Sequence, residues 1–289
     1  MARWSTCKRL MRSPWSQLVE ALWTLTNVIG TVIDNQPERE MMVQRMLLSN
    51  PFDEPTGAAH VPAQRVGGRK ADLAYEILKR DILFQRRVPG AQLLEKALSQ
   101  EFSCSQSTVR EALLRLTEDG LVERRGHKGT TITRTGLAEA TEMVRIRLSI
   151  EAAVACTIAD HKTIDLSEME PILERMAISN RAGDIYTCAE LDRLFHCTLA
   201  RIAGMGLLAP ILQRCILHIH RFTLSGVEVP RTFFQEAGIA EEHRDLLADL
   251  VSGDGARAER AARGHIAHVL ERWSPSLHFA VGREDFVDA

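Results

Sequence analysis

The sequence lacks several patterns that would assign a protein of this length to a particular structural class. No two of its six cysteines stand in a C-x-x-C pair. This spacing argues against a zinc finger and against a disulfide framework. It favours reduced thiols in a cytoplasmic protein. The cysteines are Cys7, Cys104, Cys156, Cys188, Cys197 and Cys215.

A membrane-spanning run is missing too. The most apolar stretch, residues 18–33, is only 16 residues long and contains Glu20, Thr24, Thr26 and Asn27. A transmembrane helix needs about 20 predominantly apolar residues, so this stretch is too short and too polar. A basic start before an apolar run resembles a secretion signal, but no clean small-residue cleavage site follows it.

The chain as a whole has no large excess of charge of one sign, but one region has a local excess of positive charge. The net charge is -2. Residues 69–136 contain 13 Lys and Arg against 9 Asp and Glu, whereas the rest of the chain contains 23 against 29. Neutralising nucleic-acid phosphates requires local positive charge. The modest basic excess therefore makes residues 69–136 the candidate nucleic-acid-binding region, provided that they also contain a binding motif.

Residues 94–133 contain such a motif. The apolar spacing in residues 95–102 predicts a short helix. Ser105 follows after a short polar turn, where it can cap a second helix that places Val109 and Leu113 on one face and ends at Gly120. Two helices joined in this way are typical of a helix-turn-helix whose second helix recognises DNA. A helical hairpin with an ordinary β-ribbon is the alternative.

A predicted hairpin wing follows the second helix. Residues 121–125 and 130–133 have strand composition, and the tight turn between them is flanked by glycines. A helix N-terminus and a basic wing can both approach phosphates, through backbone N–H groups, the helix dipole and cationic side chains. The candidate DNA-binding residues are Ser105, Gln106, Ser107, Thr108, Arg110, His127, Lys128 and Gly129.

The rest of the chain divides around this region. Residues 1–67 are a poorly defined N-terminal extension and linker, within which the methionines at positions 41, 42 and 46 offer an alternative start. Residues 68–135 are the winged helix-turn-helix domain, which begins with a supporting helix over 69–84. Residues 136–275 form a second domain, and residues 276–289 are expected to be a loose tail.

The second domain is predicted to be entirely helical. Gly, Pro and Ser-rich breaks separate the helices, and no strand alternation occurs between them. The fold class is therefore mainly α: an N-terminal winged helix-turn-helix with a small β-hairpin wing, and a C-terminal bundle of six or seven helices. The predicted helices are 137–160, 165–182, 184–203, 207–223, 232–251 and 255–273.

Histidines single out one candidate site in this bundle. Asp192 and His196 are four residues apart, so they point the same way from one helix. His243 and His265 lie near the inner faces of the last two helices. Three imidazoles and a carboxylate suit a divalent transition metal such as Zn, Ni, Mn or Fe. The alternative for each is a surface or hydrogen-bonded core residue, which is the interpretation favoured for the histidines at 218, 220, 268 and 278.

Residues 70–275 resemble a GntR-family transcription regulator of the FadR subfamily, with a helical ligand-binding domain of the FCD type. The first domain matches at Val88-Pro89-Gly90, at Ser105 to Leu113, at Gly120-Leu121-Val122 and at Gly126-His127-Lys128-Gly129. The second domain matches at Arg147 to Glu151, at Leu191 to His196, at Glu242-His243-Arg244, at Gly253-Asp254, and at Ala261 and His265. The order and spacing are those of the family.

The resemblance implies that Asp192, His196, His243 and His265 hold a metal with open positions for the carboxylate of a small organic acid. It also implies that Arg147 pairs with that carboxylate, since a guanidinium can bind one bidentately. A surface ion pair with Glu151 is the alternative role for Arg147.

The resemblance also matches Arg110 to the arginine of the recognition helix, which reads guanine or clamps phosphate. Two residues depart from the family pattern. Gln106 stands where Arg is usual, so the base preference is expected to shift toward adenine. Met205 stands where Asn often follows the Gly, at the expected mouth of the pocket.

The implied function is that of a homodimeric, ligand-responsive repressor that binds a palindromic DNA operator. Two alternatives remain. The His and Asp site could serve a metal-dependent enzyme, although the sequence contains no H-E-x-x-H motif, no nucleophile motif and no assignable general base. Alternatively, the helical domain could serve only for dimerisation.

Overall fold

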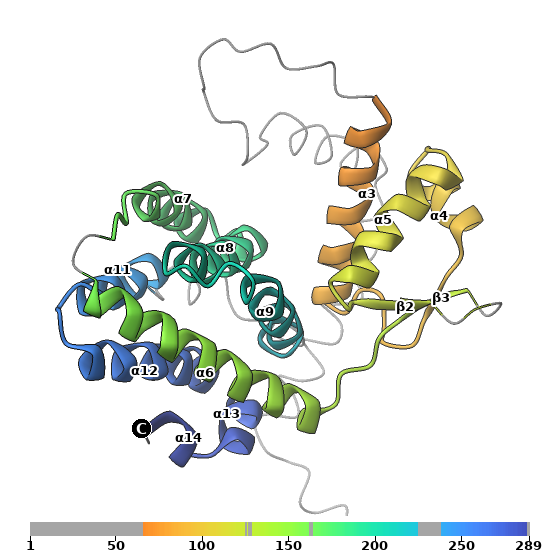
Figure 1. The fold of residues 1–289 in the computed structure, drawn as a ribbon. Coiled ribbons are helices and arrows are strands. Elements are labelled where there is room, and N and C mark those ends of the chain that lie inside the picture. Colours follow the sequence, from red (N-terminus) through yellow and green to blue (C-terminus); the bar gives the residue numbers. More distant parts are fainter. Residues whose placement is uncertain (1–65, 125, 127–128, 162–163, 225–237, 288–289) are drawn as a thin grey trace, which may run out of the picture. The chain divides into compact units, whose positions relative to one another are not determined.

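The computed structural model describes residues 66–124, 126, 129–161, 164–224 and 238–287 (Figure 1). All of them belong to one compact unit, Ala63–Ala289. The predictions for the N-terminal extension and for His127 and Lys128 fall outside these residues. Among the helices described, none is long and apolar enough to cross a membrane.

Three helices form the first domain: α3 (Val66–Leu83), α4 (Glu95–Glu101) and α5 (Gln106–Glu118). Helix α3 buries Leu78 and Ile82, one turn apart, against α5, which contributes Val109 and Leu116. Fully burying an aliphatic side chain of this size contributes roughly 1.5 to 3 kcal/mol. The positions of these three helices confirm the predicted supporting helix and helix-turn-helix.

The wing is a three-stranded antiparallel sheet in the order β1-β3-β2. Its strands are β1 (Gln92–Leu93), β2 (Val122–Arg124) and β3 (Thr130–Ile132). Val122 pairs with Ile132, and Leu93 pairs with Thr130 on the other side of β3. The hairpin was expected, whereas the pairing of β1 with it was not, because two residues carry too little pattern to specify a partner strand.

The second domain is a helical bundle (Figure 1). Its first and last long helices have the predicted bounds, and the helix expected from residue 232 is described from Ile239 onward. The helices are α6 (Leu137–Asp160), α7 (Met169–Ala182), α8 (Ile185–Ile202), α9 (Ala209–Thr223), α11 (Ile239–Leu250) and α12 (Gly255–Trp273). The predicted fold class is confirmed: the protein is mainly helical with one small sheet.

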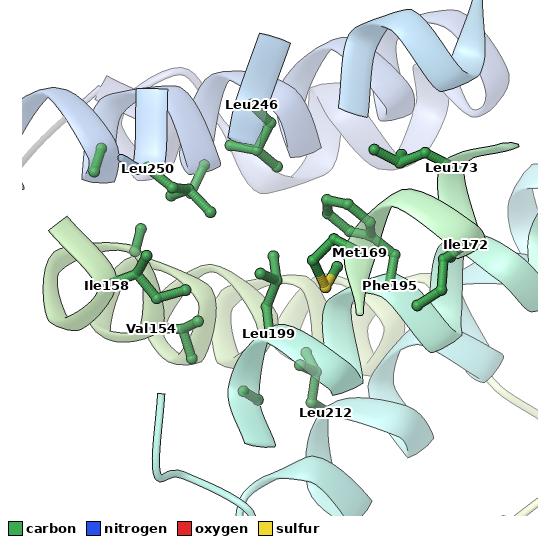
Figure 2. Close-up of a cluster of buried hydrophobic side chains, with 14 of the residues drawn as sticks. Val154, Ile158, Met169, Ile172, Leu173, Phe195, Leu199, Leu212, Leu246 and Leu250 are labelled. Atoms are coloured by element: carbon green, nitrogen blue, oxygen red, sulfur yellow. The ribbon is translucent and has the colours of Figure 1, made fainter. Parts of the chain in front are cut away.

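Apolar side chains from all six of these helices meet in the bundle core, and Figure 2 shows part of this cluster. Phe195 of α8, Leu173 of α7 and Leu212 of α9 are completely buried, and Leu250 of α11 is nearly so. Val154 of α6 lies in the same cluster. Because α8 contributes Phe195 to this packed core, the adjacent residue His196 is held on a rigid element.

The loose tail expected for residues 276–289 is wrong for most of that segment. Residues Pro275–Val281 form α13 and Glu284–Val287 form α14. Leu277 and Val281 lie one turn apart and pack with Phe286 in a cluster that includes residues of α6 and α12. Arg145 also donates to Asp285 at 2.9 Å. The prediction failed because two helices of seven and four residues are too short to show a clear periodicity.

Candidate metal centre and nucleic-acid interface

The four predicted metal ligands come together in the bundle. Asp192 and His196 lie on α8, His243 on α11 and His265 on α12. Each offers one ligand atom, and these atoms all lie within 4.8 Å of one another. All four residues are buried, His196 and His243 almost completely. The i, i+4 spacing on α8 and the inner faces of α11 and α12 thus converge as the sequence predicts.

The carboxylate of Asp192 lies at the centre of the cluster. Its Oδ1 is 3.2 Å from Nε2 of His243 and 3.5 Å from Nε2 of His196. Its Oδ2 is 3.3 Å from Nε2 of His220, on α9, and 4.0 Å from Nη2 of Arg147, on α6. The two oxygens therefore have different neighbours.

The histidine rings are oriented as metal ligands require. Nδ1 of His243 lies 2.7 Å from the carbonyl oxygen of Ile239, which can only accept, so in the neutral ring Nδ1 carries the proton and Nε2 has a lone pair for a metal. Nδ1 of His196 lies 2.7 Å from Oε2 of Glu151. Nε2 of His265 is buried without a hydrogen-bond partner among the described residues. Backbone and carboxylate partners of this kind usually orient metal-bound imidazoles, so the residues fit a metal.

The electrostatics favour the ligating forms of two of the four side chains. Burial alone would raise the pKa of Asp192, but His196 and hydrogen bonds from neighbouring histidines hold it well below its usual range. Burial, together with the nearby His243 and His196, lowers the pKa of His265 well below the ordinary value. Asp192 is therefore ionised and His265 neutral at neutral pH, as metal binding requires.

Arg147 lies beside this cluster and is 1 % exposed. Its Nε donates to Oε1 of Glu151 at 2.6 Å, so the alternative pairing with Glu151 does occur, but in the interior and not at the surface. Its Nη2 is buried and has no hydrogen-bond partner within the described part of the chain. A guanidinium nitrogen available in this way supports the predicted effector-binding role, which stays a prediction.

Sequence reasoning missed His220. It is buried on α9, where Ile216, Leu217 and Ile219 are buried as well. Because nearly every residue in this part of α9 is buried, the periodicity gives no reason to select one histidine. Its contact with Asp192 depends on how α8 and α9 pack, which the sequence pattern does not specify.

The predicted DNA-binding residues gather at the N-terminal end of α5. Ser105 caps the helix by accepting the backbone N–H of Thr108 at 3.1 Å. Gln106, Ser107 and Arg110 are exposed, whereas Thr108 is buried and is therefore poorly placed for contact through its side chain. Gly129 at the end of the wing turn has a φ of 80°, a left-handed conformation that favours glycine.

The first domain touches the helical domain through a polar network. Lys79 of α3, which is 1 % exposed, lies 2.8 Å from Oε2 of Glu190 on α8. The hydroxyl of Tyr186 donates to Glu76 at 2.7 Å, and Gln213 of α9 donates to Asp119 at 2.9 Å. Burial would raise the pKa of Glu190, but the adjacent cations, including Lys79, lower it to about 2. The network therefore joins ionised groups from both domains.

The segment between the domains is also fixed to α9. Nη2 of Arg221 donates to the carbonyl oxygen of Thr133 at 2.7 Å, and Nη1 donates to the hydroxyls of Thr133 and Thr135 at 3.0 and 3.1 Å. Nδ1 of His218 lies 2.7 Å from the same Thr135 hydroxyl. His218 is thus a hydrogen-bonded core residue, as favoured for it from the sequence.

Comparison with known protein families identifies both domains. Residues 70–132 match the model for "Bacterial regulatory proteins, gntR family", and residues 142–268 match the FCD domain. The chain belongs to the GntR family of regulators, in the group with an FCD domain. Its relatives are transcription regulators, and it is accordingly a DNA-binding transcription regulator and not an enzyme.

Individual relatives agree with this assignment. The transcriptional repressor RspR of Escherichia coli K12 is 29 % identical over 201 residues, which cover 68 % of this chain and 86 % of RspR. LutR of Bacillus subtilis 168 is 27 % identical over 204 residues, covering 63 % of this chain and 90 % of LutR. The solved structure of E. coli McbR/YncC shares the fold, with a TM-score of 0.56 at 23 % identity over 74 % of this chain and 99 % of McbR/YncC.

Proposed function

We propose that this protein is a homodimeric, cytoplasmic repressor whose operator affinity is controlled by a small organic acid bound at a metal in the helical domain. The observation that carries the proposal is the convergence of Asp192, His196, His243 and His265, with ligand atoms within 4.8 Å of one another. Such a buried donor set is costly unless it is paired or coordinated, and coordination to a metal accounts for it.

Three imidazoles and one carboxylate suit Zn, Ni, Mn or Fe. A metal bound there would supply open coordination positions and positive charge for the carboxylate of the effector. Arg147 contributes a second cation 4.0 Å from Asp192, and its Nη2, which makes no hydrogen bond to any described residue, is available to donate to the effector's carboxylate. The effector is therefore expected to be a small carboxylic acid.

Helix α8 provides a route from this site to the DNA-binding domain. It carries Asp192 and, two residues earlier, Glu190, which holds Lys79 of α3. A change in the position of α8 on effector binding would therefore alter the contact that holds the first domain. Coupling of two distinct sites through an element with two positions is what allostery requires.

On DNA, the two recognition helices of a dimer would read the half-sites of a palindromic operator. Gln106 and Arg110 are the residues proposed to contact bases and phosphates, and the exposed N-terminal end of α5 supports this role. Repression is the proposed outcome because RspR is named a repressor and a relative in Paenarthrobacter nicotinovorans is named a probable repressor of a D-xylose utilization operon.

The metal is tested by elemental analysis of protein purified without chelators. The variants His243→Ala and His265→Ala should lose most of the bound metal because each removes a ligand. The control is His268→Ala, which removes an exposed histidine from the same helix as His265 and should leave the metal content unchanged. Equal metal content in all four proteins would remove the metal from the proposal.

A thermal-shift screen of small carboxylic acids tests the effector. Stabilisation of the metal-loaded wild-type protein, with less in Arg147→Met, is expected from ligand binding to the folded state. If metal is absent and no acid stabilises the protein, the rival proposal of a helical domain used only for dimerisation is favoured.

A further inference from the structure

His220 contacts the carboxylate oxygen of Asp192 that is not shared with the other histidines. Oδ1 of Asp192 lies within 3.5 Å of Nε2 of both His196 and His243, whereas Oδ2 lies 3.3 Å from Nε2 of His220. His220 is 6 % exposed. It comes from α9, which contributes none of the four clustered donors.

The direction of this hydrogen bond follows from the charge of Asp192. An ionised carboxylate can only accept hydrogen bonds, so Nε2 of His220 must carry the proton. Nδ1 of His220 is buried and makes no hydrogen bond to any described residue. A polar atom buried without a partner costs stability, so an apolar residue would be preferred here if packing alone decided the choice.

We propose that His220 is a positioning residue of the metal centre. It holds Oδ2 of Asp192, which leaves Oδ1 directed toward His196 and His243 as the ligand atom for the metal. Carboxylate ligands are commonly fixed by an outer hydrogen bond of this kind. The inference rests on the proposed function, because it takes the Asp192 cluster to be a metal site.

The residue next to His220 in the chain connects it to the segment between the domains. The next residue, Arg221, holds Thr133 and Thr135 in the segment between the domains. The Asp192–His220 hydrogen bond therefore connects the metal centre to the helix that fixes this segment. We expect occupation of the site by metal to change operator affinity partly through this contact.

The test compares variants that keep or remove the donor at Nε2. Gln can place an amide N–H near the position of Nε2, whereas the shorter Asn cannot reach it and Leu has no donor. Zn²⁺ affinity is measured by competition with a chromophoric chelator. His220→Asn and His220→Leu should weaken it roughly 10- to 100-fold, and His220→Gln should retain most of it.

Two controls separate positioning from general packing. His218→Gln changes a buried histidine on the same helix that does not contact Asp192 in any described interaction, and it should keep the wild-type Zn²⁺ affinity. Thermal unfolding of the metal-free variants measures packing alone. If His220→Leu does not fold, the comparison of Asn with Gln decides, because both are polar and differ mainly in reach.

The outcomes distinguish this inference from the proposed function. If the wild-type protein binds no Zn²⁺, the metal site fails and the inference fails with it. If the wild type binds Zn²⁺ and His220→Asn binds it equally well, only the inference is overturned. Weaker binding in Asn, restored in Gln, together with a smaller effect of Zn²⁺ on operator affinity in Asn, supports it.

Discussion

His218 shows how a single buried side chain can make this protein sensitive to pH. It is 4 % exposed, and its Nδ1 contacts Thr135 in the segment between the domains. Burial, with help from the nearby cations Arg221 and Arg214, lowers its pKa to about 4. Free histidine has a pKa of about 6.5, so the unfolded chain takes up a proton at a pH where the folded protein does not.

The sign of the effect follows from this difference. Above about pH 6.5, His218 is neutral in both states and does not lower the free energy of unfolding. As the pH decreases from 6.5 toward 4, the unfolded chain is protonated first, so the free energy of unfolding falls. Below about pH 4 both states are protonated and this group causes no further change. At pH 5 this group should lower the free energy of unfolding by about 2 kcal/mol relative to pH 7. Urea unfolding at pH 7 and pH 5 measures it: His218→Gln should lose less stability than the wild type between the two values.

The control for this prediction is His268→Gln, which removes a half-exposed histidine from α12. It should lose as much stability on acidification as the wild type does. If His218→Gln behaves in the same way, protonation of His218 does not limit stability in this range.

Among individual residues, the sequence predicted correctly those whose spacing along a helix fixes the direction of their side chains. Asp192 and His196 had to point together because they are one turn apart, and the histidines of α11 and α12 stood next to apolar residues that had to face the core. The contacts of His220 with Asp192 and of His218 with Thr135 join residues 28 and 83 positions apart. Such contacts depend on the packing between elements, which a local pattern does not contain.

Among the elements, the recognition helix α5 has the clearest consequence for DNA binding. Arg110 is exposed near its N-terminal end, where Nη2 lies 2.7 Å from Oε2 of Glu95. Arg115, five residues further along, lies 2.6 Å from Oδ1 of Asp72 and stacks over the ring of Tyr75. The two arginines therefore carry equal charge in different surroundings.

Arg110→Ala should weaken operator binding roughly 10- to 100-fold, because it removes the proposed base or phosphate contact. Arg115→Ala removes the same charge from the same helix and should have a smaller effect. Titration of labelled operator DNA at fixed salt concentration measures both, since the affinity of such complexes depends strongly on salt. Equal losses in the two variants would mean that net charge, and not a specific contact of Arg110, decides affinity.

The elements differed in how far they could be predicted. Helix α5 had a capping serine before it and a glycine after it, and Gly120 indeed has the left-handed conformation, with a φ of 75°. The bounds of α6 and α12 were correct because each is long enough to show several turns of the pattern. The short β1, α13 and α14 are stabilised by neighbours distant in the sequence, so their own residues gave too little indication of structure.

For the whole molecule, the contact of Lys79 with Glu190 lies where the two domains meet. Lys79 lies 2.8 Å from Glu190 and 4.8 Å from the centre of the Tyr75 ring. Glu190 has a second partner, Arg193, at 2.7 Å. Loss of Lys79 therefore does not leave this carboxylate unpaired, so the contact between domains can be removed selectively.

Lys79→Met, which keeps the side-chain length without the charge, should reduce the effect of Zn²⁺ on operator affinity while Zn²⁺ itself still binds. The reason is that α8 would no longer hold α3 by an ion pair. Operator dissociation constants with and without Zn²⁺ provide the measurement. Arg201→Met is the control, because Arg201 pairs with Glu168 within the helical domain. An unchanged response in Lys79→Met would show that the coupling takes another route.

The hydrogen bonds from Arg221 to Thr133 and Thr135 have a consequence for the spacing of the operator half-sites. A segment fastened in this way does not behave as a freely jointed tether, so its length gives the attached recognition helix little additional reach. In the proposed dimer, the separation of the two half-sites would then be narrowly defined. Inserting one or two base pairs at the centre of the operator should therefore be poorly tolerated, and replacing Arg221 should widen the range of spacings that the protein accepts.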